Sequence, residues 1–200
     1  MSHAVGETGQ VVAFEPVPFT FGTLSTVVDR LGLDNVELVN AGCSDREGTT
    51  EFVIPKQGTG VTDDLQAHLA DRHDPGPAVP VESVQCEIVR LDDALEGTDR
   101  VDVMKLDIEG AELEALRGGS GVLERFHPVV IAEVDAEFLG GFGHTPADLE
   151  GFLGSLGYSP WHYRGDDGTL EPLESLAMIK HANVVFLPES GRDRFAEVMA

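Results

Sequence analysis

Cysteine is nearly absent from this sequence of 200 residues, which contains only Cys43 and Cys86. Two cysteines cannot build a disulfide framework or a zinc site with four cysteine ligands. Long apolar runs are absent as well, since no segment approaches the roughly 20 apolar residues that a bilayer crossing requires. The first residues lack the charged and then apolar pattern of a secretory signal. We therefore expect a cytoplasmic protein with neither a membrane span nor a disulfide scaffold.

Basic residues are also scarce. Lysine and arginine together number 13 against 36 acidic residues, which gives a formal net charge of −23. Such a chain repels phosphate backbones and anionic membrane surfaces, so we expect neither nucleic acid nor a membrane as a partner. Two interpretations of this charge stay open. One is an ordinary solvated acidic surface, and the other is a halophilic adaptation, in which screening over about 3 Å at 1 M salt removes the self-repulsion.

The rest of the composition is that of a packed domain, with 42% hydrophobic and 24% charged residues. Short apolar runs alternate with segments of helical periodicity. The pattern predicts strands at residues 10–14, 35–40, 49–55, 84–90, 101–106, 128–134, 158–163 and 183–187, helices at 20–31, 91–95, 111–117 and 145–156, and mostly loop at 55–80. We expect one α/β domain over residues 1–200, with a mainly parallel sheet and an antiparallel strand pair at its end.

An acidic residue follows the first predicted strand. Glu15 comes directly after residues 10–14, and open parallel sheets bind ligands beyond the carboxyl ends of their strands. A carboxylate in that place can accept hydrogen bonds from both hydroxyls of a ribose, so Glu15 is a candidate for holding a nucleoside cofactor. An acid before a proline, here Pro16, is also commonly a simple cap of the strand end. The residues alone leave both interpretations open.

Charged and apolar residues alternate where the predicted strand at 101–106 ends. The period of two puts Lys105, Asp107 and Glu109 on one face. Together with Glu112 they form a cluster of three carboxylates and one ammonium, which is costly unless something binds there. An ion pair between Lys105 and Asp107, with the remaining acids near a helix N-terminus, explains the same pattern without a ligand.

The segment VDVMKLDIEGAELEALRGG, residues 101–119, resembles the motif of the FkbM-family S-adenosylmethionine-dependent methyltransferases. The flanking segments are similar as well: GQVVAFEP resembles that family's second strand, NVELVNAGCSDREGTTEF its third strand and turn, HPVVIAEVD its fifth strand, and GY with NVVFLP its closing strand pair. The resemblance covers about residues 9–188. It implies a Rossmann-like class I methyltransferase sheet with S-adenosylmethionine as cofactor.

The resemblance also implies a function and a cofactor site. Members of the family typically methylate hydroxyl groups on sugars or natural-product scaffolds, so we expect O-methylation of such a small molecule. By carry-over of the motif, Glu15 would bind the ribose of the cofactor, and Ser44 and Asp45 would lie near its adenine.

The methyl-transfer site implied by the resemblance is lined by Lys105, Asp107 and Glu109. Methyl transfer from a sulfonium depends mostly on alignment and on removal of the acceptor proton. Asp107 or Glu109 is the expected base. Asp107 and Glu133 are the candidates if a divalent cation acidifies the acceptor hydroxyl instead, although we expect no metal.

The sequence departs from the family pattern at its beginning. Methyltransferases of this fold start with a strand that ends in a Gly-x-Gly loop and leads into a helix, and only nine residues precede Gln10 here. We therefore expect the first strand, its glycine loop and the first helix to be missing, because the start lies upstream or the chain is truncated. Residues 1–200 should then bind S-adenosylmethionine very weakly or not at all, and should tend to self-associate through an open sheet edge.

Two other functions stay open. An acid after the second strand also suits a nicotinamide-dependent oxidoreductase, but KLDIEGAE and the closing strand pair favour the methyltransferase. The second alternative is a truncated, non-catalytic methyltransferase-like protein that acts through partner binding. Binding of S-adenosylmethionine separates this alternative from an enzyme.

Overall fold

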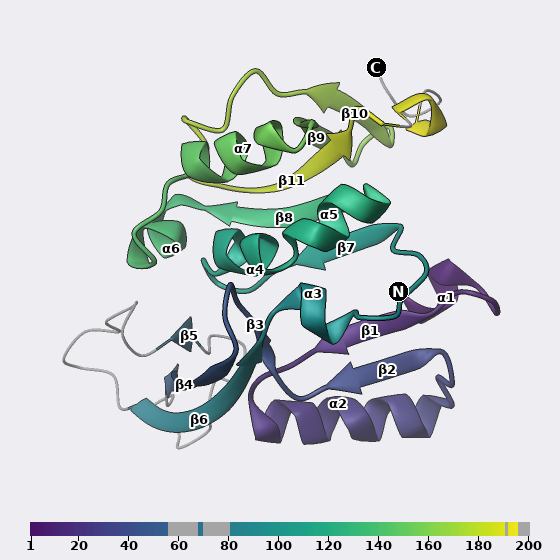
Figure 1. Ribbon diagram of the computed structural model, residues 1–200, viewed down its shortest axis with the longest axis vertical. Helices are drawn as coiled ribbons and strands as arrows, with labels where there is room; N and C mark the ends of the chain where they lie inside the picture. The colour runs from purple at the N-terminus through teal and green to yellow at the C-terminus, as the bar shows by residue number, and fades with distance from the viewer. Residues whose placement is uncertain (56–67, 70–80, 191, 196–200) are drawn as a thin grey trace. The chain divides into compact units, whose positions relative to one another are not determined.

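The computed structural model describes residues 1–55, 68–69, 81–190 and 192–195. The chain divides into two compact units, Met1–Val89 and Arg90–Ala200, which we call the first and the second unit and describe separately (Figure 1). The expectation of a single domain over residues 1–200 stays a prediction. The loop predicted at 55–80 lies mostly outside the described residues.

The described residues of the first unit form two helices and two small sheets. Its elements are α1 (Ser2–Val5), β1 (Val11–Phe14), α2 (Pro18–Leu31), β2 (Val36–Val39), β3 (Gly42–Cys43), β4 (Gly48–Pro55), β5 (His68–Leu69) and β6 (Val81–Val89). Strands β1 and β2 are parallel. The other sheet has the order β3-β6-β4-β5, in which β3 and β6 are parallel and the remaining neighbours are antiparallel.

Helix α2 ends where the sequence predicts and begins slightly earlier than predicted. Pro18 occupies the first turn, where the missing N–H costs no intrahelical hydrogen bond. Gly32 ends the helix in the left-handed conformation with φ 59°, and its N–H donates to the Asp29 carbonyl. The helix begins two residues before the predicted start because Pro18 fits the first turn.

The second unit contains the larger sheet and most of the fully buried side chains. Its helices are α3 (Leu91–Ala94), α4 (Glu112–Gly118), α5 (Ser120–Phe126), α6 (Ala136–Gly141) and α7 (Pro146–Ser155), and a 3-10 helix covers Arg192–Phe195. Its strands are β7 (Val103–Leu106), β8 (Val129–Asp135), β9 (Tyr158–Arg164), β10 (Thr169–Pro172) and β11 (His181–Pro188). They form one sheet of order β10-β9-β11-β8-β7.

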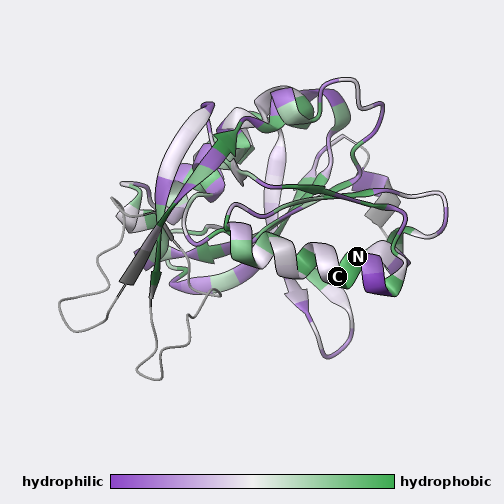
Figure 2. Ribbon diagram, turned by 90° about the horizontal axis from the view of Figure 1, so that it is seen from below, coloured by the Kyte–Doolittle hydropathy of each residue, from purple (hydrophilic) through white to green (hydrophobic). Residues whose placement is uncertain are grey.

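Strand β8 lies inside the core of this unit. Val130, Ala132 and Val134 alternate along it and are fully buried. Helices α4 and α7 contribute further side chains with no exposed surface, among them Leu113, Leu116, Leu149 and Leu153. Figure 2 shows the apolar residues concentrated along strands and on parts of the helices. Burial of such side chains contributes about 1.5–3 kcal/mol each. This core therefore fixes the position of β8, whose other face carries Glu133 and Asp135.

The prediction of a mainly parallel sheet is wrong. Among the described residues three strand pairs are parallel and five are antiparallel. The sequence pattern identified most strands, but it could not distinguish β4–β6 as a hairpin-like antiparallel pair from two strands joined by a crossover. The predicted antiparallel pair at the end is confirmed by β9 and β11, to which β10 adds a further strand.

Helices α5 and α6 were not predicted, because their N-termini are capped by side chains whose role depends on the fold. The carboxylate of Asp92 accepts hydrogen bonds from the N–H groups of Gly121 and Val122 at the start of α5, 29 and 30 residues further along the chain. Asp135 caps α6 in the same way. Gly118 and Gly119 therefore join α4 to α5, whereas the sequence predicted only the end of one helix at this pair.

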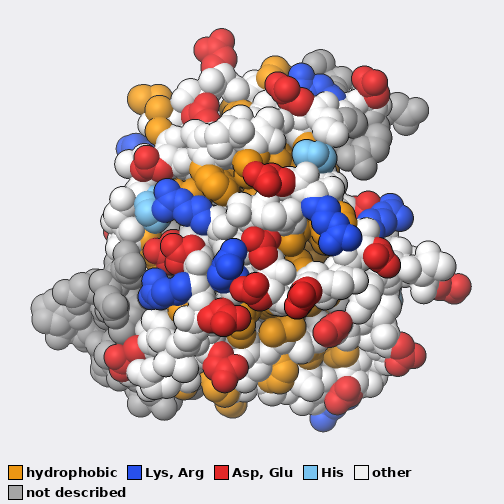
Figure 3. All heavy atoms as spheres, in the orientation of Figure 1, with side chains coloured by type: hydrophobic (Ala, Val, Ile, Leu, Met, Phe, Trp, Pro, Cys, Tyr) orange, Lys and Arg blue, Asp and Glu red, His pale blue; other side chains and the backbone are white. Residues whose placement is uncertain are grey.

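The end strands of each sheet keep one edge without a neighbour among the described residues, and β1 and β7 are two of them. Within the part of the chain that the structure describes, β1 pairs only with β2 and β7 pairs only with β8. Self-association through such an edge stays a prediction, as does the missing first strand. The acidic side chains are spread over the face shown in Figure 3, and several lie beside basic side chains. Among the described residues, no helix has the length and apolar character needed to cross a bilayer.

Candidate active site

Strand β7 presents its charged residues as its alternation predicts. Met104 and Leu106 are buried, whereas Val103 and Lys105 are exposed. Asp107 follows the strand directly, and its Oδ2 lies 2.6 Å from the Nζ of Lys105. The predicted ion pair between these two residues is therefore confirmed. It leaves the Asp107 carboxylate at the carboxyl end of a strand that is parallel to its neighbour β8.

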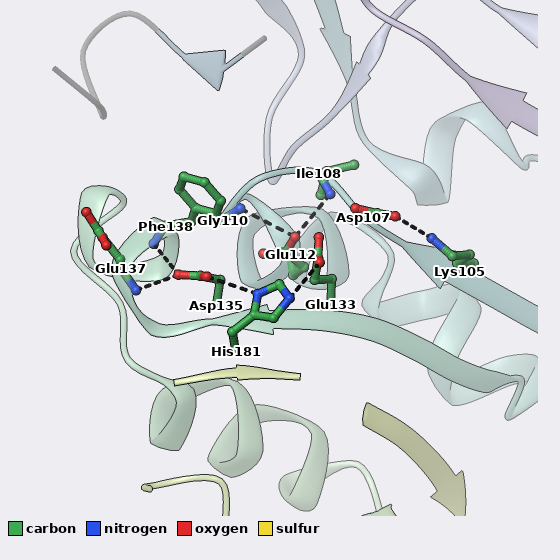
Figure 4. A network of polar contacts seen from close by, with 10 residues as sticks. All are labelled: Lys105, Asp107, Ile108, Gly110, Glu112, Glu133, Asp135, Glu137, Phe138 and His181. Carbon is green, nitrogen blue, oxygen red and sulfur yellow. Dashed lines mark hydrogen bonds and ion pairs between the residues drawn. The ribbon is translucent and has the colours of Figure 1, made fainter. Parts of the chain in front are cut away.

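The turn from β7 into α4 is held by Glu112. This side chain is 1% exposed, and its Oε1 accepts hydrogen bonds from the N–H of Ile108 at 3.1 Å and of Gly110 at 3.4 Å (Figure 4). Burial raises the pKa of Glu112. Glu109 and Gly110 have φ values of 54° and 100°. Glu112 therefore stabilises the turn, and its role in the motif is structural.

Gly110 is required by its surroundings. A Cβ at this position would overlap the backbone carbonyl of Phe138 in α6. The positive φ of Gly110 is also a conformation that side chains disfavour. The glycine of the motif thus lets the turn after β7 approach the helix that follows β8.

Strand β8 brings Glu133 to Asp107. The carboxyl groups of the two residues lie close enough to act on each other's pKa. The hydrogen bond from Lys105 and the neighbouring carboxyl group of Glu133 lower the pKa of Asp107. The neighbouring carboxyl group of Asp107 and burial raise the pKa of Glu133 to about 7. Asp107 is therefore the more acidic member of the pair, and Glu133 is the member that holds a proton more readily.

His181 joins this pair from β11. Because β11 is antiparallel to β8 and His181 is paired with Asp135 in register, the first residue of β11 lies at the carboxyl end of β8. The imidazole Nε2 lies 3.4 Å from Oε1 of Glu133, and Nδ1 lies 3.1 Å from Oδ2 of Asp135. Figure 4 shows the ring between the two carboxylates.

Asp135 fixes this arrangement through its other oxygen. Its Oδ1 accepts hydrogen bonds from the N–H groups of Glu137 at 2.8 Å and Phe138 at 3.1 Å. Burial alone would raise the pKa of Asp135, but the hydrogen bonds from Phe138, Glu137 and His181 lower it. Asp135 is thus an ionised acceptor, and its Oδ1 contacts the backbone of α6 whereas its Oδ2 contacts His181.

The residues predicted to bind the cofactor lie in the first unit. Glu15 follows β1, and its Oε1 accepts a hydrogen bond of 2.8 Å from the N–H of Val17. Ser44 is 5% exposed, and its N–H donates to the Val89 carbonyl. Asp45 lies beside Arg46, with 3.8 Å between carboxylate and guanidinium. All three lie at or just beyond the ends of strands β1 and β3.

Contacts inside the first unit show how these strand ends relate. A Cβ built on Gly42 in β3 would lie 3.5 Å from the Cβ of Pro16, so the residue after Glu15 packs beside the segment that leads to Ser44. Burial and then the charge of Glu15 raise the pKa of Cys86 in β6 to about 11. The carboxylate of Glu15 thus acts on a residue of β6 as well as on the backbone beyond β1.

The structure therefore brings together some of the predicted catalytic residues and adds two. Lys105, Asp107 and Glu133 form one network in the second unit, and the charge of Glu109 in the same turn raises the pKa of Glu133. His181 and Asp135 were missed. Their signal was the predicted antiparallel strand at 183–187, because the start of such a strand lies at the carboxyl end of the strand it pairs with. In the structure this strand begins at His181 and pairs with β8, whose last residue is Asp135.

Metal ligands were considered for Asp107 and Glu133. No group of three or more His, Cys, Asp or Glu side chains within the described part of the chain is arranged to hold a metal ion.

Comparisons with known proteins agree on the family. The model of the methyltransferase FkbM domain matches residues 1–160. The chain is 29% identical over 119 residues to "Methyltransferase 1" of Beauveria bassiana (strain ARSEF 2860), and 28% identical over 135 residues to "Methyltransferase sdnD" of Sordaria araneosa. Each match covers 54% of this chain, and the chain spans about half the length of these relatives, 48% and 51%.

A solved structure supports the fold. The methyltransferase FkbM from Methylobacillus flagellatus KT superposes with a TM-score of 0.52 over 93% of this chain and 41% of that chain, at 14% identity. This likeness supports an α/β fold with mixed sheets. Since the family model matches most of the sequence, including the strand, turn and carboxylates described above, the chain belongs to the FkbM methyltransferase domain family.

Proposed function

We propose that this chain is an S-adenosylmethionine-dependent methyltransferase that O-methylates a hydroxyl group on a sugar or natural-product-like small molecule. One observation carries the proposal beyond the family: the parallel strands β7 and β8 bring the carboxyl groups of Asp107 and Glu133 together beside Lys105, where each acts on the pKa of the other. Transfer of a methyl group to a hydroxyl requires that one proton leave, and a carboxyl group with a pKa of about 7 is suited to take it.

The residues of the second unit divide the chemistry among them. Lys105 keeps Asp107 ionised through the ion pair of 2.6 Å. Asp107 orients Glu133 and raises its proton affinity. Glu133 in its ionised form accepts the proton of the acceptor hydroxyl. The sequence predicted Asp107 or Glu109 as the base. We assign this role to Glu133 instead.

The first unit supplies the contacts expected for the cofactor. Glu15 is suited to hold the two ribose hydroxyls, because its carboxylate is fixed at the end of β1 by the N–H of Val17. Ser44 and Asp45 are suited to contact the adenine. When bound, S-adenosylmethionine supplies the methyl group.

The test is transfer of a labelled methyl group from millimolar S-adenosylmethionine to a panel of hydroxylated small molecules. We expect transfer to a hydroxyl oxygen, and in Glu133→Gln a fall of about 10²–10⁴-fold, the usual contribution of a general base. Glu124→Gln is the matched control, because Glu124 is exposed in α5 of the same unit. A chain that neither binds S-adenosylmethionine at millimolar concentration nor transfers a methyl group would favour the non-catalytic alternative.

A further inference from the structure

His181 lies where a proton could enter and leave the carboxyl pair. Its ring connects Glu133 on one side with Asp135 on the other, at 3.4 Å and 3.1 Å. The side chain of His181 is 59% exposed, whereas those of Glu133 and Asp135 are 22% and 21% exposed. The imidazole is therefore the member of this row that meets solvent.

The hydrogen bonds of Asp135 decide which ring nitrogen carries hydrogen. Since Asp135 is ionised and accepts from two backbone N–H groups of α6, it can only accept from His181 as well. Nδ1 of His181 therefore donates to Oδ2 of Asp135. The other ring nitrogen, Nε2, then faces Oε1 of Glu133 at 3.4 Å.

We propose that His181, oriented by Asp135, is a positioning residue that exchanges protons with Glu133 and passes the proton taken from the acceptor hydroxyl to solvent. The inference rests on the proposed function for the origin of that proton. In the reaction the acceptor O–H bond breaks and an O–C bond forms, while the C–S bond of the methyl donor breaks and its electron pair stays on sulfur. The hydroxyl proton moves to the Glu133 carboxylate, then to Nε2 of His181, and then to water.

Several charged groups act on Glu133 from the elements around it. Asp107 after β7 and Glu109 in the following turn raise its pKa, and the charge of His181 from β11 lowers it. Lys105 acts through Asp107. Asn183, which is paired with Glu133 in register, is uncharged. The pKa of Glu133 thus depends on groups that raise it and a group that lowers it. Substitutions of these groups should shift this pKa in opposite directions.

The experiment follows the carboxyl group of Glu133 by carbon-13 NMR titration of the whole chain, without cofactor. The parent should titrate near pH 7. In His181→Gln the midpoint should rise by about half a pH unit or more, because the charge of His181, which lowers the pKa of Glu133, is lost. In Asp107→Asn it should fall by at least as much, because the largest cause of the raised pKa is removed. His162→Gln, exposed in β9, is the control that should not move it.

The pH profile of methyl transfer is the second measurement. In the parent, the rate should rise with pH and reach half its maximum near pH 7. In His181→Gln the midpoint of this pH profile should move to higher pH, which loss of packing alone would not cause. A Glu133 midpoint unchanged or lowered in His181→Gln would overturn the inference even if methyl transfer occurs. A raised midpoint without methyl transfer in any variant would support the coupling of His181 to Glu133 and count against the proposed function.

Discussion

Two acids that follow strands in the same way have different surroundings in the two units. Glu15 follows β1 in the first unit, and its carboxylate is bonded to a backbone N–H two residues further on. Asp107 follows β7 in the second unit, and its carboxylate contacts the side chains of Lys105 and Glu133. A backbone donor fixes an acceptor in place, whereas titratable side chains make it part of a proton-sharing group. The same pattern therefore suits binding in one unit and proton transfer in the other.

The neighbouring strands explain the difference. Beside β1, strand β2 is followed by Asn40, whose uncharged amide donates to the backbone carbonyls of Glu15 and Pro16. Beside β7, strand β8 carries Glu133, which adds a second carboxyl group within hydrogen-bond reach of Asp107. Coupled titration needs two ionisable groups in contact, and the described contacts place such a pair at Asp107.

The largest effect is expected for the glycine that shapes the turn of the second unit. Gly110→Ala should lower the free energy of unfolding by about 3–4 kcal/mol, because the methyl group overlaps the Phe138 carbonyl at a positive φ. Gly42→Ala in the first unit is the comparison. Its Cβ would make ordinary contacts of 3.4–3.5 Å, so the loss should stay below about 1 kcal/mol. Denaturant titration measures both, and equal losses would contradict the assigned role of Gly110.

Glu15→Ala should separate binding from proton chemistry. We expect the affinity for S-adenosylmethionine to fall by about 1.5–3 kcal/mol, the value of a charged hydrogen-bonded contact. The free energy of unfolding should also fall, by about 1–3 kcal/mol, because the N–H of the buried Val17 loses its acceptor. Glu37→Ala, an exposed acid in β2, should leave the affinity unchanged. Calorimetric titration compares the variants. An affinity insensitive to Glu15 would remove this residue from the cofactor site and leave it as a strand-end cap.

Local patterns predicted the elements whose causes lie within a few residues. The alternation of Lys105 and Leu106 gave the correct faces of β7, and Gly32 gave the correct end of α2. The pairing of Asp107 with Glu133, and of His181 with both Glu133 and Asp135, depends on strand order instead. A periodic pattern reports which face a residue occupies, but it does not report which strand lies beside it.

The smallest effect is expected at a cap that the sequence did predict. Thr145 accepts from the N–H of Asp148 at 3.2 Å, and Asp148 accepts in return from the N–H of Thr145 at 2.8 Å, which completes the capping box at the start of α7. Thr145→Ala should cost about 1 kcal/mol of unfolding free energy, and Thr145→Ser should restore most of it, because a serine hydroxyl accepts the same hydrogen bond.

The cap of α5 by Asp92 provides the matched test across a long sequence separation. Asp92 accepts from Gly121 and Val122 and also pairs with Arg90 at 3.3 Å. Asp92→Ala should therefore cost more than Thr145→Ala, because it removes two backbone partners and an ion pair, and it should release α5 from α3. Denaturant titration with helical circular dichroism measures both variants. An equal or smaller loss in Asp92→Ala would show that α5 is held by the burial of Val122 and Leu123 alone.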